Sequence, residues 1–211
     1  WEGGELRLLR SVGYSKNVSP QRFLEHAGVA NAFAREAKTR DRPDLIVASV
    51  PTIELAYEAV LYGARADVPV LLDVRDLWPD VLFNVLPARL RWIGRIALSW
   101  LTVKARVALT GCSGIVGISP AYLAWGLKIA GRAQGTSDGV FPLGYVRRSE
   151  GSALSPVVGQ NLVKMGVDES RKLCWYVGSF GRTYDLAPVI RAARTLHDSN
   201  RTDVQFVISG D

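Results

Sequence analysis

The chain has 211 residues, of which 48% are hydrophobic and 22% charged, and its mean hydropathy is +0.09. This composition is typical of a globular protein and excludes both a disordered chain and one built mainly from membrane-spanning helices. The two cysteines, Cys112 and Cys174, lack the spacing of a metal site, so we expect buried thiols in a reducing compartment. The two histidines, His26 and His197, fall in predicted helices, where we expect structural roles.

The net charge of +6 is distributed unevenly along the chain. No acidic residue occurs in the sequence between Asp80 and Asp138, whereas the same interval contains Arg89, Arg91, Arg95, Lys104, Arg106, Lys128 and Arg132. A basic segment of this kind suits anionic partners, namely lipid headgroups, nucleotide phosphates or nucleic acid.

The first predicted elements are a strand over residues 5–12 and a helix that begins after Ser19 and Pro20 and continues to about Lys38. Serine followed by proline is a typical N-cap and first-turn pair. The apolar side of this helix consists of Phe23, Ala27, Ala30, Phe33, Ala34 and Ala37.

Residues 43–80 predict the unit around which the fold is organised. Residues 45–48 and 70–74 are short apolar runs that predict buried strands, and residues 53–64 between them have apolar side chains at helical spacing. We expect two parallel strands joined by a right-handed crossover. Since ligands bind at the carboxyl ends of parallel strands, the turn with Arg75, Asp76 and Asp80 is a candidate site. The alternative is an Arg–Asp pair that only caps the next helix.

Residues 86–109 predict one long helix. At 100° per residue, one narrow sector holds Arg91, Arg95, Ser99, Thr102 and Arg106, and most of the remaining surface is apolar, with Trp92 and Trp100. This pattern fits a helix at a membrane surface, and it is too charged to span a bilayer. The alternative is a helix packed on the sheet with its arginines in solvent, and both can hold for different parts of it.

The rest of the chain predicts a second βαβ unit after a linker. A strand over 114–119, a helix over 121–130 and a last strand and turn over 139–144 complete a first domain, 1–146. The pattern then loosens, which predicts a linker over 147–171. In the second domain, 172–211, we expect strands over 173–177 and 204–208 and a helix capped by Asp185.

The loop of residues 178–184 is a second candidate site. Glycines between a strand and a helix let backbone amides approach a phosphate, and Arg182 adds a full positive charge. The alternative is a tight turn without a ligand.

Six stretches, in this order, carry a family resemblance: PDLIVASVPT, VPVLLDVRDLWPD, IVGISPAYL, FPLGY, YVGSFGRTYDLAPVIRAAR and VQFVISGD. Together they resemble glycosyltransferase family 4, in the subset with an RDLWP-type turn. The resemblance implies an α/β chain of GT-B architecture, in which two Rossmann-like parallel-sheet domains face a cleft and the second holds a nucleotide-sugar. It also implies sugar transfer with retention of anomeric configuration, without an essential metal or a cofactor.

The resemblance also implies roles for particular residues, while the catalytic residues stay unknown. Arg75 and Asp76 occupy the place where many members have His-Asp, and Ser179 and Tyr184 stand where many have Arg and Lys for the donor diphosphate. The expected acceptor cleft contains Arg75, Asp76, Trp78, Asp80 and Ser119. The expected diphosphate site contains Gly178, Ser179, Gly181, Arg182 and Tyr184. The expected membrane contacts are Arg91, Arg95, Trp100 and Arg106.

The family's first strand with its glycine-rich loop and its downstream glutamate pair, spaced seven residues apart, have no counterpart in the sequence. The chain begins at Trp1 rather than Met. We therefore expect a fragment in which both domains are incomplete and which is inactive alone.

For the intact protein we expect transfer from a UDP- or GDP-sugar to a lipid-linked or polysaccharide acceptor in cell-surface glycan biosynthesis. Its expected location is cytoplasmic, peripheral at the inner face of the cell membrane and in contact with anionic lipid. The alternatives are a sugar-nucleotide epimerase of the same architecture and a non-catalytic membrane-surface binding module. Nucleic-acid binding is not expected, because the chain lacks strands with interleaved aromatic and basic residues.

Overall fold

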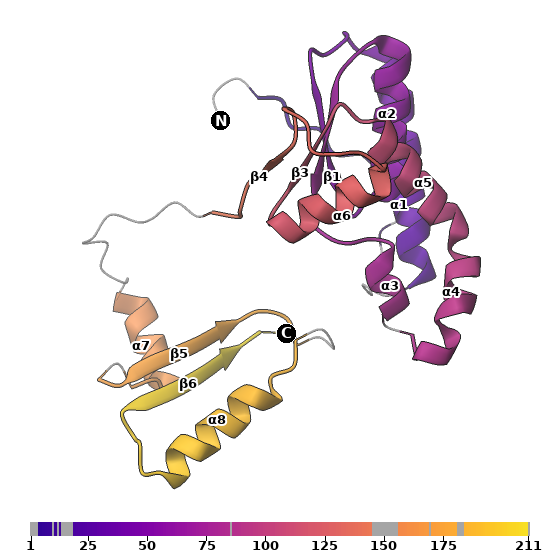
Figure 1. Cartoon of the computed structure of the whole chain (residues 1–211). Coiled ribbons are helices and arrows are strands. Elements are labelled where there is room, and N and C mark those ends of the chain that lie inside the picture. Colours follow the sequence, from indigo (N-terminus) through magenta and orange to yellow (C-terminus); the bar gives the residue numbers. More distant parts are fainter. Residues whose placement is uncertain are drawn as a thin grey trace. The chain divides into compact units, whose positions relative to one another are not determined.

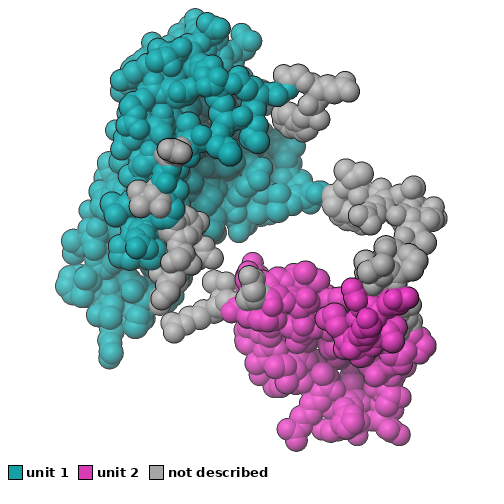
Figure 2. Space-filling view, turned by 180° about the vertical axis from the view of Figure 1, so that it is seen from behind, with its two compact units in different colours: residues 1–145 teal, residues 146–211 magenta. Residues whose placement is uncertain are grey.

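The computed structural model describes residues 4–9, 11, 13, 19–84, 86–144, 156–168, 170–180 and 184–210. The chain divides into two compact units, residues 1–145 and 146–211 (Figure 2). Within the described residues, each unit contains one parallel sheet with helices, of four strands in unit 1 and of two strands in unit 2. The α/β class with two parallel sheets, compatible with Rossmann-like domains, is therefore confirmed.

The sheet of unit 1 consists of β1 (Ile46–Val50), β2 (Val70–Val74), β3 (Gly114–Gly117) and β4 (Gly139–Val140). The helical segments of this unit are α1 (Pro20–Glu36), η1 (Ala37–Thr39), α2 (Ile53–Ala66), α3 (Asp80–Asn84), η2 (Ala88–Leu90), α4 (Arg91–Ala97), α5 (Ser99–Gly111) and α6 (Pro120–Ala130). The predicted strand–helix–strand unit of residues 45–74 is confirmed, as are the predicted helices that begin near Pro20 and Pro120.

The four strands lie in sequence order and all pairs are parallel (Figure 1). Repeated right-handed crossovers in one direction place the connecting helices on one face of the sheet. Accordingly, α2 contacts β1, α6 contacts β3, and α5 packs against both α2 and α6. Ala48 and Val50 of β1 are buried on this face, whereas Val47, on the opposite face of β1, is 62% exposed.

Small residues bring α2 and α5 close together. The buried surfaces of the two helices contain Ala56, Ala59, Ala105 and Ala108, and Leu101 and Leu109 fill the space toward the sheet. Alanine at a helix contact allows a close approach of the two backbones, and large neighbours then complete the packing. This core fixes the helices that carry the candidate site.

Two predictions for unit 1 are wrong. In the strand predicted over residues 5–12, the described residues 5–9 and 11 form no regular secondary structure, and Leu6 and Leu8 are almost fully exposed. Residues 10 and 12 lie outside the described residues. The predicted helix over 86–109 is divided into η2, α4 and α5, with a break at Leu98 (φ −106°, ψ 19°). The break lets α4 pack against α3 while α5 packs against α2 and α6.

Unit 2 consists of α7 (Pro156–Lys164), β5 (Lys172–Val177), α8 (Ala187–Asp198) and β6 (Val204–Ser209). Strands β5 and β6 are parallel, with Lys172 opposite Val204 and Val177 opposite Ser209, so the second βαβ unit is confirmed. Helix α7 lies within residues 147–171, where we expected a linker. Cys174 in β5 is exposed, contrary to prediction, because this small sheet leaves most of the side chains of β5 in solvent.

Within the described residues, the structure contains no helix long and apolar enough to cross a bilayer.

Candidate functional site

The carboxyl ends of β1, β2 and β3 form one edge of the unit 1 sheet. Beyond the strands, the Arg75 N–H donates a hydrogen bond to Val50 O at 3.0 Å, and the Ile118 N–H donates to Val74 O at 3.4 Å. The segments that follow β2 and β3 therefore leave the sheet next to each other. These segments contain all the residues predicted for the acceptor cleft.

Arg75 belongs to a polar cluster that the sequence did not predict. Its Nε donates to Asp73 Oδ2 at 2.5 Å, and the Ser49 hydroxyl donates to the same oxygen at 3.4 Å. Ser49 and Asp73 are register partners on adjacent strands, on the sheet face away from the helices. The only sequence signal for this cluster was the spacing of Asp73 and Arg75, two residues apart along one strand direction.

Asp76 and Asp80 have different roles in the turn. Asp76 Oδ1 accepts a hydrogen bond from the Leu77 N–H at 2.8 Å, which fixes the start of the turn. Asp80 opens α3, and its Oδ2 accepts from Trp125 Nε1 of α6 at 2.9 Å. Ser119 precedes α6, and its carbonyl accepts from the backbone of Tyr122 and Leu123. Arg75 bonds Asp73, and Asp76 bonds the backbone of the turn.

Trp78 belongs to the candidate turn, and its side chain is 4% exposed. Its ring lies 6.1 Å from the ring of Phe23 and 5.5 Å from that of His26, and the Arg22 guanidinium carbon lies 4.5 Å from its centroid. All three partners belong to α1. Trp78 therefore attaches the candidate turn to α1.

A pocket of about 440 Å³ connects the turn to the basic helices. Its walls come from α3, α4 and α5, with the residues Asp80, Phe83, Arg95, Ser99, Thr102, Val103, Arg106 and Val107. Four members of the predicted polar sector thus line one cavity together with Asp80. Arg91, the fifth member, is not a lining residue, and its Nε donates to Leu86 O at 3.4 Å. We call this cavity the α3–α5 pocket.

The surface next to the α3–α5 pocket is apolar and exposed. Trp92 and Ile96 of α4 are 61% and 66% exposed, and Ile93, Trp100 and Val103 are also exposed. Trp100 packs edge-on against Phe23 at 6.1 Å, and Lys104 lies over its ring at 5.5 Å. We call this surface, with its arginines, the α4–α5 face.

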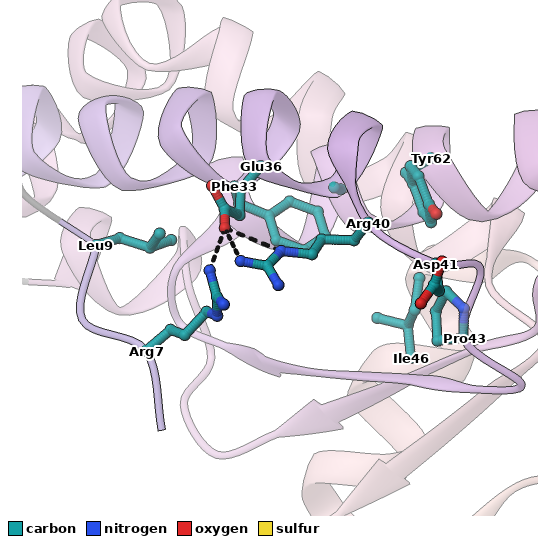
Figure 3. Close-up of a pocket in the computed structure, with 10 residues that line it drawn as sticks. Arg7, Leu9, Phe33, Glu36, Arg40, Asp41, Pro43, Ile46 and Tyr62 are labelled. Atoms are coloured by element: carbon teal, nitrogen blue, oxygen red, sulfur yellow. Dashed lines mark hydrogen bonds and ion pairs between the residues drawn. The ribbon is translucent and has the colours of Figure 1, made fainter. Parts of the chain in front are cut away.

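A second cavity, of about 340 Å³, lies near the amino end of β1 (Figure 3). Phe33, Ile46 and Tyr62 give it an apolar wall. Three of its charged groups bind one another, since Glu36 Oε1 accepts from Arg7 Nη1 at 2.6 Å and from Arg40 Nη2 at 2.7 Å. The cavity is at the opposite end of β1 from the candidate turn, so it is separate from the predicted site.

In unit 2 the described part of the predicted diphosphate loop follows β5 and precedes α8. The Gly178 N–H donates to Ser209 O at 3.0 Å, and the Tyr176 hydroxyl donates to Ser179 O at 3.0 Å. Tyr184 is exposed, and its ring lies 6.3 Å from that of Tyr176. Asp185 caps α8 through a 3.0 Å bond from the Ala187 N–H to its Oδ1, as predicted. Gly181 and Arg182 lie outside the described residues.

Among the described residues, no group of His, Cys, Asp and Glu side chains is arranged to hold a metal ion. Asp138 forms a bidentate ion pair with Arg132, which donates to it from Nη1 at 2.5 Å and from Nη2 at 2.8 Å. This pair holds the pKa of Asp138 far below its usual range. It ties the start of β3 to the segment after α6 and is structural.

Comparison with known proteins assigns no family to this chain. No model of a known protein family matches the chain, and a search of curated proteins found no significant match.

Proposed function

We propose that this protein acts as a retaining glycosyltransferase that moves a sugar from a UDP- or GDP-sugar onto a lipid-linked acceptor at an anionic membrane surface. The observation that carries the proposal is the α3–α5 pocket, because it joins Asp80 of the RDLWP turn to Arg95 and Arg106.

The chemistry of the α3–α5 pocket suits a phosphate attached to an apolar chain. Two guanidinium groups and the hydroxyls of Ser99 and Thr102 are donors for phosphate oxygens. Phe83, Val103 and Val107 offer apolar wall on the side of the exposed α4–α5 face. A lipid-linked sugar phosphate has this combination of groups, whereas a soluble polysaccharide has neither a phosphate nor a lipid chain.

The position of the turn supports a reacting sugar near Arg75 and Asp80. Open parallel sheets bind ligands beyond the carboxyl ends of their strands, and this turn follows β2. In unit 2, the loop that begins at Gly178 has the corresponding position after β5, where backbone amides and the α8 N-terminus favour a diphosphate. In this proposal, unit 1 provides the acceptor site and unit 2 the donor site.

Transfer to a lipid acceptor tests the proposal. Protein from the complete coding sequence is incubated with labelled UDP- or GDP-sugar and vesicles that contain a polyprenyl-diphosphate sugar, and the label in the organic extract is measured. Each arginine near a lipid phosphate contributes about 1 kcal/mol, so replacing both Arg95 and Arg106 by Gln should lower acceptor affinity roughly 30-fold. The matched control replaces two exposed arginines of α8, Arg191 and Arg194, by Gln.

A non-catalytic membrane-binding module is the second candidate, and the exposed apolar side chains of the α4–α5 face favour it. It predicts equal binding to anionic vesicles with and without the sugar acceptor, and no sugar transfer. That pair of results would contradict the glycosyltransferase proposal.

A further inference from the structure

The α3–α5 pocket contains charges of both signs. Arg95 and Arg106 bring two positive charges to its wall, and Asp80 brings a negative one. Among the described residues, neither arginine forms an ion pair with Asp80. Instead, the Arg95 guanidinium carbon lies 5.9 Å from the centre of the Phe83 ring. Opposite charges that line one cavity without binding each other can each take a different group of the same ligand.

A neighbouring helix holds the Asp80 side chain in place. Its Oδ2 accepts a 2.9 Å hydrogen bond from Trp125 Nε1 of α6, and Trp125 packs against the core of unit 1. An ionised carboxylate has about four acceptor positions on its two oxygens, so this bond leaves acceptor capacity for a ligand. Asp80 is therefore a positioned acceptor. A hydroxyl group can donate to it, whereas a phosphate is repelled because both groups are negative.

A sugar changes both the charge and the hydrogen bonding of a lipid diphosphate. The terminal phosphate of a bare lipid diphosphate carries a charge of about −1.5 to −2 at pH 7, as phosphate monoesters do. A sugar esterified to this phosphate leaves one negative charge and adds hydroxyl donors. A carboxylate in the pocket therefore attracts the glycosylated lipid and repels the bare one, and specificity commonly combines these two effects.

We propose that Asp80, held by Trp125, makes the α3–α5 pocket select a lipid diphosphate that already carries a sugar over the same lipid diphosphate without one. Arg95 and Arg106 bind the phosphates, and Asp80 accepts a hydrogen bond from a sugar hydroxyl. The protein then extends a glycan rather than starting one, so a reaction that attaches the first sugar to the lipid must supply its acceptor. The inference rests on the proposed function, because it takes this pocket as the acceptor site.

Vesicle binding and sugar transfer, measured side by side on protein from the complete coding sequence, test this selectivity. Neutral phosphatidylcholine vesicles contain either polyprenyl diphosphate or polyprenyl diphosphate that carries one hexose. Wild type should bind the glycosylated lipid about tenfold more tightly than the bare lipid, and should transfer labelled sugar to it at least about tenfold faster.

Asp80→Asn removes the negative charge and keeps a side-chain oxygen to which Trp125 can donate. The variant should bind the bare lipid about tenfold more tightly than wild type does, so that the preference for the sugar disappears. Asp67→Asn is the matched control and should behave like wild type. It removes the same charge at an exposed position that follows α2, at the amino end of the sheet.

Trp125→Phe separates the position of the carboxylate from its charge. It keeps an aromatic ring against the core and removes the N–H that binds Asp80. The affinity for the glycosylated lipid should fall about fivefold, because the carboxylate is no longer held, while the affinity for the bare lipid should not change.

Two results would overturn the selectivity while leaving the proposed function in place, provided that wild type transfers sugar. One is equal affinity of wild type for the two lipids, and the other is a D80N variant that keeps the preference. Transfer by wild type to neither lipid would contradict the proposed function itself, and this inference with it.

Discussion

At the scale of single residues, buried charge in this protein is tolerated where hydrogen bonds surround it. The side chain of Asp138 is 1% exposed and accepts bonds from Arg132, from the Ile115 N–H at 2.7 Å and from the Gly135 N–H at 2.7 Å. Because these donors favour the ionised form, its pKa is lowered. Burial in the core is the largest influence on Glu54, and it raises the pKa of that carboxyl. The two carboxyls therefore affect stability in opposite directions as the pH changes.

We expect Asp138→Asn to lower the free energy of unfolding by about 2 kcal/mol at pH 7, since it weakens a charge-assisted pair with Arg132. The folded-state pKa of Asp138 is depressed, so its stabilising effect is full above the ordinary carboxyl value of 3.8 and is lost as the pH falls toward the folded-state value. Urea unfolding at pH 7 and pH 3 should show a smaller difference between variant and wild type at pH 3. Asp67→Asn is the control, because Asp67 is exposed and has a positive φ of 53° that asparagine also accepts. A D138N chain as stable as wild type at pH 7 would show that the pair of Asp138 and Arg132 does not stabilise the fold.

At the scale of elements, the βαβ unit of residues 46–74 could be predicted because local signals and packing agree. Its strands are short apolar runs, and its helix has one continuous apolar side. The strand predicted over residues 5–12 was wrong because apolar residues such as Leu6 and Leu8 form a strand only where a neighbouring strand pairs with them. The break at Leu98 could not be predicted, since no proline or glycine occupies that position and the bend is imposed by packing on two different neighbours. The Ser49–Asp73–Arg75 cluster depends on strand register, which a single sequence does not specify.

The contact between α2 and β2 gives a prediction with an unusual sign. Replacing glycine by alanine inside a helix usually stabilises by about 1 kcal/mol. At Gly63, however, an added Cβ would lie 2.5 Å from Val70 Cγ2 and 2.6 Å from the Val68 carbonyl oxygen. We expect Gly63→Ala to destabilise by about 1–3 kcal/mol, because the backbone of residue 68 cannot move without disturbing β2.

The control for that substitution is Gly28→Ala in α1, where the nearest atom to the added Cβ is the hydroxyl of Ser11 at 2.9 Å, the end of a rotatable side chain. Thermal unfolding should show a higher midpoint for G28A and a lower one for G63A. Equal effects of the two substitutions would mean that α2 and β2 do not approach as closely as described.

At the scale of the whole molecule, the two units differ in how much they bury. The large buried side chains Ile53, Leu72, Leu101, Leu109 and Ile115 all belong to unit 1. In unit 2, the side chains of β5 and α8 are largely exposed, including Trp175 and Ile190. Since burial of apolar surface is the main source of stability, unit 1 should be the more stable part.

The two cysteines report on this difference, because each unit contains one. Cys112 is buried, its Sγ–H donates to Leu109 O at 3.3 Å, and burial raises the pKa of its thiol. Cys174 is exposed on β5.

In the native protein at pH 8, a thiol reagent should label one cysteine within minutes, and peptide mapping should identify it as Cys174. Cys112 should react only through unfolding of unit 1. Its labelling should be slower than that of Cys174 by roughly 1,000-fold or more, as expected for a domain stable by about 4 kcal/mol or more. Increasing urea should expose it in step with the loss of helical signal. Cys174→Ser should abolish the fast phase and leave the slow phase unchanged. Fast labelling of Cys112 in the native protein would show that the helix-covered face of the unit 1 sheet opens freely, which a core built around Leu72 and Leu109 does not allow.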